Sequence, residues 1–122
     1  MKLEFAAGKV SIQLDADRWG PYTYDFETGI PAGRTLASVT VKSYLGRVKP
    51  KDSDIIDTFE ETTSELIDTL SLTSDYVASV YFDRPTTESY INAKHSLVFT
   101  ITLDAAGGGG VHTAFYYQVE VL

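Results

Sequence analysis

Hydrophobic and polar residues alternate along the last third of the chain, on both sides of a glycine-rich segment. The first run places four apolar residues on one face: Leu97, Phe99, Ile101 and Leu103. The second run places six residues on one face: Val111, Thr113, Phe115, Tyr117, Val119 and Val121. Successive side chains of a strand point to opposite faces, so each run predicts a half-buried strand. Together the two runs predict a β-hairpin.

The alternation also predicts how the two strands of this hairpin pair. The expected cross-strand pairs are Leu103 with Val111, Ile101 with Thr113, Phe99 with Phe115 and Leu97 with Tyr117. Apolar and aromatic pairs of this kind stabilise a sheet, and a one-residue slip would turn the apolar set toward water. We therefore expect the Leu97, Phe99, Phe115 and Tyr117 side chains to face the interior.

Earlier parts of the chain carry weaker versions of the same pattern. Alternating runs at residues 9–14, 22–26, 36–45 and 76–82 predict four more strands. Residues 52–72 are ambiguous, because apolar residues four apart favour a helix whereas frequent threonines favour strands. We expect two short strands there, at 55–59 and 66–72, and possible further strand at 89–92. The prediction is an all-β, immunoglobulin-like antiparallel sandwich of seven to eight strands, forming a single domain over residues 1–122.

Composition narrows the class of protein. The 122 residues include no cysteine and carry a net charge of −7. This charge argues against nucleic-acid binding, which needs clustered lysine and arginine. The N-terminal residues lack the apolar stretch of a signal peptide, and no segment has membrane-spanning length. We expect a protein that is made in the cytoplasm and does not bind a membrane.

The charged residues are unevenly distributed along the chain. A short basic stretch precedes a long segment in which every charged residue is acidic. This pattern is typical of a solvated surface, and it also allows a polarised surface that docks against a neighbouring protein. The residues predicted for such a docking surface are Lys42, Arg47, Lys49, Lys51, Glu60, Glu61, Glu65 and Asp68.

No motif in the sequence indicates catalysis or a bound cofactor. The glycines at 107–110 precede a strand rather than a helix, so they favour a hairpin tip over a phosphate loop. His95 and His112 are expected at opposite ends of the hairpin and cannot share a metal ion. Three aspartates at 52, 54 and 57 lack the glycine and glutamate of a calcium loop. We expect no enzyme activity, no cofactor and no metal.

A cluster of aromatic residues supports an alternative function. Trp19, Tyr22 and Tyr24 surround a Gly-Pro loop, and exposed aromatic rings suit stacking against sugars. Alternating aromatics are also typical of core-facing strand positions. The alternative function is therefore a carbohydrate- or ligand-binding sandwich that uses these three side chains.

One segment resembles a known group of proteins. Residues 24–41, YDFETGIPAGRTLASVTV, combine an aromatic-Asp-aromatic stretch, an apolar-Pro-x-Gly turn and a Leu-Ala-Ser-x-x-Val strand opening. The chain then closes with an apolar strand, a glycine-rich turn and an alternating strand. It resembles immunoglobulin-like structural modules of tailed bacteriophages and prophages, including fibre–tail adaptor proteins. The resemblance implies a non-enzymatic virion component at the tail, neck or fibre attachment, which docks to other virion proteins or to copies of itself. Such a component would be in the bacterial cytoplasm during assembly and then in the virion.

Overall fold

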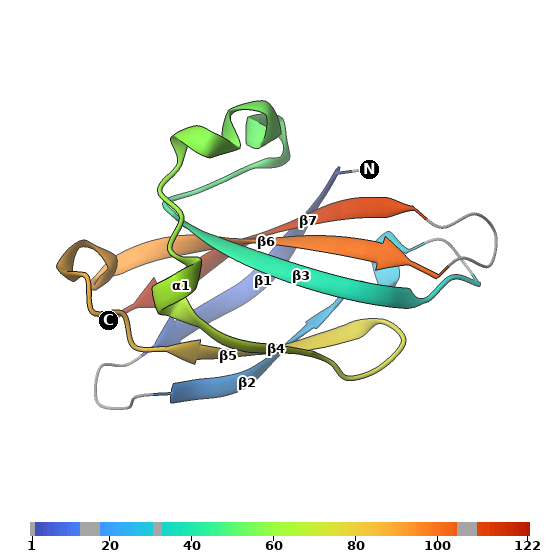
Figure 1. Cartoon of the computed structure of the whole chain (residues 1–122), viewed down its shortest axis with the longest axis horizontal. Coiled ribbons are helices and arrows are strands. Elements are labelled where there is room, and N and C mark those ends of the chain that lie inside the picture. Colours follow the sequence, from blue (N-terminus) through green and yellow to red (C-terminus); the bar gives the residue numbers. More distant parts are fainter. Residues whose placement is uncertain (1, 13–17, 31–32, 105–109) are drawn as a thin grey trace.

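The protein is built from two β-sheets (Figure 1). The computed structural model describes residues 2–12, 18–30, 33–104 and 110–122, with side chains from residue 18 onward except 117 and 118. The four-stranded sheet has the order β1 (Lys2–Ile12), β7 (Val111–Val121), β6 (Ala93–Leu103) and β3 (Leu36–Leu45). The three-stranded sheet has the order β2 (Arg18–Asp25), β5 (Val77–Asp83) and β4 (Ile67–Leu72). An all-β sandwich is thereby confirmed.

One strand pair departs from the expected antiparallel arrangement. Strand β1 runs parallel to β7, whereas every other named pair is antiparallel. Parallel neighbours cannot be joined by a tight hairpin. Here the rest of the sandwich separates the two strands in sequence.

The main core lies between the two sheets. Its fully buried side chains include Val80 and Phe82 from β5 and Leu97 and Phe99 from β6. All four apolar residues that the alternation placed on the inner face of β6 are buried, which confirms that prediction. Tyr24 joins this core, and its ring packs edge-on against that of Tyr116 with centroids 4.8 Å apart. Such edge-to-face packing is favourable for aromatic rings.

The pairing of β6 with β7 differs from the expected register by one residue. Phe99 lies opposite Ala114, and Phe115 lies opposite Val98. Ala114 and Tyr116 therefore face the main core, whereas Phe115 is buried on the outer face of the sheet. A bulge follows, because Ser96 pairs with residue 117 and His95 with residue 119. The extra residue restores Val119 and Val121 to the core face. The side chain of Tyr117 lies outside the described residues.

In the part of the chain that the structure describes, three 3₁₀ segments and one α-helical turn connect the strands. They are η1 (Glu27–Gly29), η2 (Pro50–Thr58), α1 (Thr63–Leu66) and η3 (Glu88–Tyr90). The strand expected at 55–59 is wrong, because those residues belong mostly to η2. The possible strand at 89–92 is also wrong, because η3 extends to Tyr90 and a turn follows it. The strand expected at 66–72 is confirmed as β4. Over the described part of the chain, no helix has the length and apolar character needed to cross a membrane.

Candidate docking surface

Among the described residues, the outer edge of β3 presents a stretch of backbone that no neighbouring strand pairs with. We define the β3 edge as residues 38–42. Strand β3 pairs with β6 on one side only, and the register is regular from Ser38 to Leu45. The described residues show no strand paired with the other side of residues 38–42.

The direction of the backbone groups along this edge follows from the contacts at the end of β3. The Ser43 N–H donates to Thr63 Oγ1 at 3.0 Å, and the Leu45 N–H donates to the Glu60 carbonyl at 2.8 Å. Both donors point away from β6, and backbone groups alternate in direction along a strand. The N–H and C=O groups of Val39 and Val41 therefore also point outward. Those of Thr40 point toward β6.

Residues 60–63 close the C-terminal end of the β3 edge. The Thr62 N–H donates to the Ser43 carbonyl at 2.8 Å, and Tyr44 forms an isolated antiparallel bridge with Glu61. Below this contact lies a buried polar chain, in which Ser43 Oγ is 2.7 Å from Thr62 Oγ1 and Thr62 Oγ1 is 3.2 Å from His95 Nδ1. The hydrogen bonds hold residues 60–63 in place, so the open part of the edge ends at Lys42.

The other sheet edges carry features that block strand addition. Strand β2 contains Pro21 and an irregular pairing between Trp19 and Tyr22. The pairing of β4 is irregular around Asp68, and β1 is irregular between residues 6 and 10. Prolines, charges and bulges are the devices by which natural sheets protect their edges. The β3 edge has none of these between Ser38 and Val41.

A groove lies beside this edge, on the outer face of the four-stranded sheet. Its volume is about 280 Å³. Segment η2 covers one side of it, where Ile56 and Phe59 pack against a second apolar cluster. The cluster consists of Tyr44, Val48, Val98 and Phe115. Thr40, Thr100 and Thr113 form one cross-strand row that lines the groove away from η2.

The basic residues predicted for docking do not form a separate surface. Lys42 is exposed and lies 3.9 Å from the Glu61 carboxylate. Arg47 is exposed before η2, and Lys51 lies within η2 beside three aspartates. The backbone N–H of Lys49 donates to the Asp52 carboxylate at 3.0 Å. The structure therefore brings basic and acidic residues together around η2, although the sequence separates them.

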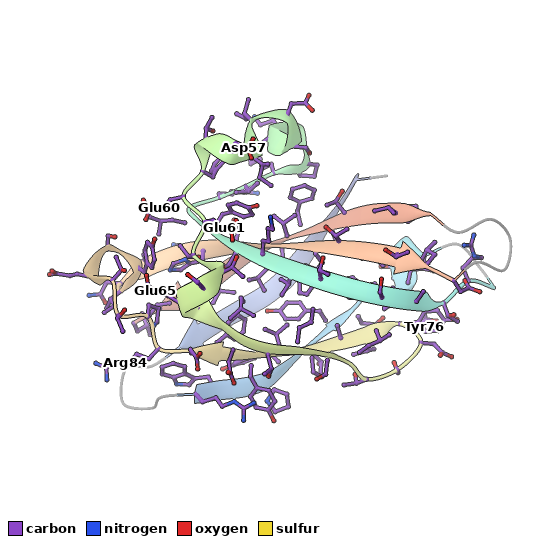
Figure 2. The ribbon with its side chains drawn as sticks, viewed as in Figure 1. Asp57, Glu60, Glu61, Glu65, Tyr76 and Arg84 are labelled. Carbon is purple, nitrogen blue, oxygen red and sulfur yellow. The ribbon has the colours of Figure 1, made fainter. Side chains whose placement is uncertain are left out.

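Of the four acidic residues predicted for docking, three lie between the end of η2 and the end of α1, as Figure 2 shows for Glu60, Glu61 and Glu65, and Asp68 lies in β4. Glu60 accepts a hydrogen bond from the Tyr90 hydroxyl, which raises the pKa of Tyr90 together with burial. Burial raises the pKa of the Tyr44 hydroxyl most, and the nearby negative charges of Glu61 and Asp57 raise it further. The carboxylates of Glu60 and Glu61 thus interact with tyrosine hydroxyls of their own chain.

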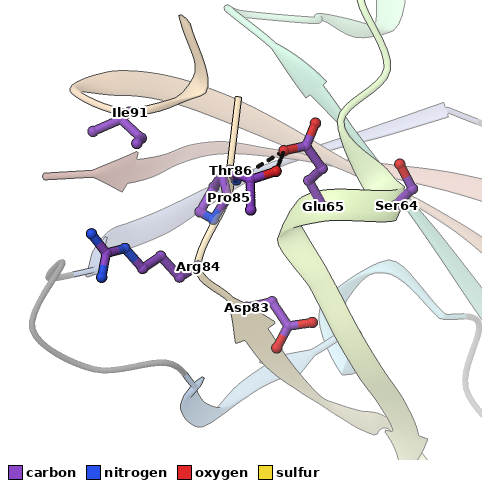
Figure 3. A pocket seen from close by; sticks show the side chains of 7 residues that line it. All are labelled: Ser64, Glu65, Asp83, Arg84, Pro85, Thr86 and Ile91. Atoms are coloured by element: carbon purple, nitrogen blue, oxygen red, sulfur yellow. Dashed lines mark hydrogen bonds between the residues drawn. The ribbon is translucent and has the colours of Figure 1, made fainter. Parts of the chain in front are cut away.

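Glu65 holds α1 to the loop after β5 (Figure 3). One carboxylate oxygen accepts from the Thr86 N–H at 2.9 Å, the Thr86 hydroxyl at 2.8 Å and the Thr87 N–H at 2.8 Å. The other oxygen accepts from the Thr87 hydroxyl at 2.5 Å. These hydrogen bonds, the one from the Thr87 hydroxyl above all, lower the pKa of Glu65 to about 2. We call this arrangement the Glu65 clamp.

An open cavity of about 670 Å³ lies beside the Glu65 clamp. It is lined by Ser64, Glu65, Asp83, Arg84, Pro85, Thr86 and Ile91. Burial and the nearby charge of Asp68 raise the pKa of Asp83. Asp68 itself pairs with Arg18 at 2.6 Å, and the Arg18 guanidinium lies over the Tyr81 ring at 3.7 Å. Glu65 and Asp68, both predicted for docking, are thus engaged within the chain.

The three aromatic residues proposed for sugar stacking all pack against the main core. Tyr24 is 5% exposed, and Trp19 and Tyr22 are partly buried. The Tyr22 ring packs against that of Phe82 with centroids 5.6 Å apart. The bulge in β2 places all three on the inner face of the sheet, so Tyr24 offers almost no surface for stacking and Trp19 and Tyr22 leave only part of theirs exposed.

The two histidines lie at different ends of the β6–β7 pair. His95 is fully buried, and His112 pairs with Ile101 near the other end. Burial lowers the pKa of both imidazoles. Of the glycine tip at 107–110, only Gly110 lies within the described residues. Among those residues, no group of three or more histidine or acidic side chains is arranged to hold a metal ion.

No protein-family model matches the chain, and neither a curated protein nor a solved structure matches it.

Proposed function

We propose that this chain is a non-enzymatic docking module of a phage or prophage virion, positioned at the tail, neck or fibre attachment. The observation that carries the docking role is the β3 edge, where Val39 and Val41 direct outward backbone groups with which no strand of the described residues pairs. An edge of this kind binds an extended segment of another protein by adding a strand to the sheet. The resemblance of residues 24–41 to phage modules supports the virion context.

The strand order supports the immunoglobulin-like part of the proposal. In constant-type immunoglobulin domains one sheet contains strands B, E and D, and the other contains C, F and G. The order β2-β5-β4 matches B-E-D, and the order β7-β6-β3 matches G-F-C. Strand β1 joins β7 instead of the sheet that contains β2. In this assignment the β3 edge is the free side of strand C.

Purified virions provide the test of this role. Tailed particles from bacteria that carry the gene should contain the chain at a constant copy number per particle through successive density gradients, measured by quantitative mass spectrometry. A chain that stays in the soluble fraction while the particles are complete without it would overturn the proposal. A chain carrying Thr40→Asp, which places a charge on the β3 edge, should be depleted from the particles. The matched variant Thr100→Asp, exposed one strand further in, should be incorporated normally.

A further inference from the structure

We infer that the β3 edge pairs with the β3 edge of a second copy of this chain, antiparallel and two-fold symmetric about Thr40. This inference rests on the proposed docking role and names the partner of that surface. The four-stranded sheets of the two copies would then form one continuous sheet. Four independent features of the edge support this arrangement.

The first feature is the direction of the backbone groups. In an antiparallel pair, residues that exchange both hydrogen bonds must point their N–H and C=O groups at each other. The backbone N–H and C=O groups of Val39 and Val41 point outward, away from β6, as the contacts of Ser43 and Leu45 establish. A two-fold axis at Thr40 places Val39 of each copy opposite Val41 of the other. This register therefore pairs Val39 and Val41, the residues whose N–H and C=O groups point outward.

The second feature is the fit of the side chains. Val39 and Val41 are partly buried against the core and leave part of their apolar surface uncovered at the edge. The same two side chains from a second copy would cover that surface. Thr40 is exposed on the outer face and would lie opposite its own copy, and threonine pairs are favourable across antiparallel strands.

The third feature is the position of the one charge on the edge. Lys42 is 63% exposed, and the two-fold register places it opposite Ser38 instead of opposite the other Lys42. Like charges directly opposite one another would destabilise the pair. The two lysines would lie at the two ends of the paired segment. The net charge of −7 on each copy opposes association at long range, so added salt should strengthen the dimer.

The fourth feature is the length of the available edge. Residues 60–63 cover β3 from Ser43 onward, and the register of β3 is irregular between Leu36 and Ser38. In the two-fold register, residue 43 of one copy lies opposite residue 37 of the other. The covered residue 43 of one copy therefore lies opposite the irregular residue 37 of the other, and residues 38–42 of each copy are free to pair. Such a short pairing predicts a weak, concentration-dependent dimer.

Cysteine cross-linking tests this register directly, because the chain contains no cysteine. In the predicted dimer the two Thr40 residues form a non-hydrogen-bonded pair with Cα atoms about 4.5 Å apart, within the range of a disulfide. The matched control is Thr100→Cys, which is exposed on β6 in the same cross-strand row. The two Thr100 positions would lie three strand spacings apart, about 14 Å, which a disulfide cannot bridge.

Under mild oxidation, Thr40→Cys should form a covalent dimer at least about 10-fold faster than Thr100→Cys. Excess wild-type chain should slow this reaction by occupying the same edge. Sedimentation at high concentration should give wild type and Thr100→Asp a mass approaching twice 13.4 kDa and leave Thr40→Asp at 13.4 kDa. Equal cross-linking rates for the two cysteine variants, or a dimer that Thr40→Asp leaves intact, would overturn the inference. A monomer that is still incorporated into virions would overturn the second copy as partner while leaving the proposed function in place.

Discussion

The Thr62 hydroxyl lies 3.2 Å from Nδ1 of His95, inside a fully buried chain of polar groups. His95 Nε2 lies 3.0 Å from the Tyr90 carbonyl, which only accepts hydrogen bonds, so Nε2 carries the proton. Burial lowers the pKa of His95, and the neutral ring therefore accepts from Thr62 through Nδ1. Thr62 in turn accepts from the Ser43 hydroxyl. One imidazole thus connects η3, β6, β3 and the segment that closes the β3 edge.

This arrangement predicts a pH dependence of stability. The folded-state pKa of His95 lies below its ordinary value of 6.5, so the unfolded chain binds the proton more readily. The free energy of unfolding should fall as the pH drops below about 6.5 toward the folded-state pKa. Urea titrations between pH 7.5 and 5.5 measure this fall. His95→Gln should make this pH-dependent fall smaller. The substitution should also lower the free energy of unfolding at pH 7.5 by about 1–3 kcal/mol, because it disrupts buried hydrogen bonds.

His112 is the control for this experiment, because burial also lowers its pKa. His112→Gln should remove a separate part of the pH dependence without the loss of stability at pH 7.5 that His95→Gln causes. A wild-type stability that does not change between pH 7.5 and 5.5 would contradict the neutral, buried His95.

The Glu65 clamp predicts a second pH effect at lower values. The pKa of Glu65 is lowered from 4.5 to about 2 by four hydrogen bonds, so the folded state favours the charged carboxylate. Its contribution to stability is present above pH 4.5 and is lost as the pH falls toward about 2. Glu65→Gln should accelerate amide exchange at Thr86 and Thr87 at neutral pH, because a neutral amide cannot accept all four bonds.

Glu61→Gln is the matched control for the clamp. Glu61 is exposed and pairs with Lys42 at 3.9 Å, so its loss should change stability by no more than about 0.5 kcal/mol and leave Thr86 and Thr87 protected. Equal exchange rates at Thr86 in the two variants would show that the clamp does not hold the loop.

Two tyrosines of the core should respond in opposite directions to removal of their hydroxyl groups. The Tyr24 hydroxyl is buried with no hydrogen-bond partner among the described residues, whereas the Tyr116 hydroxyl donates to the Asp25 carbonyl at 3.3 Å. Tyr24→Phe should leave stability unchanged or raise it by up to about 1 kcal/mol, and Tyr116→Phe should lower it by about 0.5–1.5 kcal/mol. Chemical denaturation of both variants checks the difference, and a large loss in Tyr24→Phe would reveal a partner for that hydroxyl.

The second apolar cluster should contribute to stability although it lies outside the main core. Phe115 is 2% exposed beneath η2, so Phe115→Ala should cost about 3–5 kcal/mol of unfolding free energy. Ile55 also belongs to this region but is 52% exposed, so Ile55→Ala should cost about 0.5 kcal/mol or less. Thermal melts of the two variants test whether η2 covers the sheet. Similar losses would contradict this packing.

Alternation in the sequence predicted the strands whose inner faces form the core. The runs at 36–45 and 111–121 match β3 and β7, because a period of two survives wherever one face is buried and the other is not. The hairpin register was wrong because the bulge opposite Ser96 leaves no signal in the alternation. Phe115 was assigned to the core for the same reason. A segment that later folds over the outer face makes both faces of β7 apolar.

The predicted docking residues show a different limit. Glu65 binds Thr86 and Thr87, which lie 21 and 22 residues later in the chain, and Asp68 binds Arg18, which lies 50 residues earlier. No local sequence pattern predicts such distant pairs. The β3 edge was also hidden in the sequence. Whether a strand lies at an edge depends on sheet order, which the alternation of a single strand does not contain.

Amide hydrogen exchange along β3, measured residue by residue by NMR at a protein concentration low enough to keep the chain monomeric, tests the open edge most directly. The account predicts alternating protection, with slow exchange at Thr40 and Lys42, which face β6, and fast exchange at Val39 and Val41, which face outward. Uniform slow exchange from Val39 to Lys42 in the monomer would mean that the edge is already covered, and the docking proposal would then be contradicted.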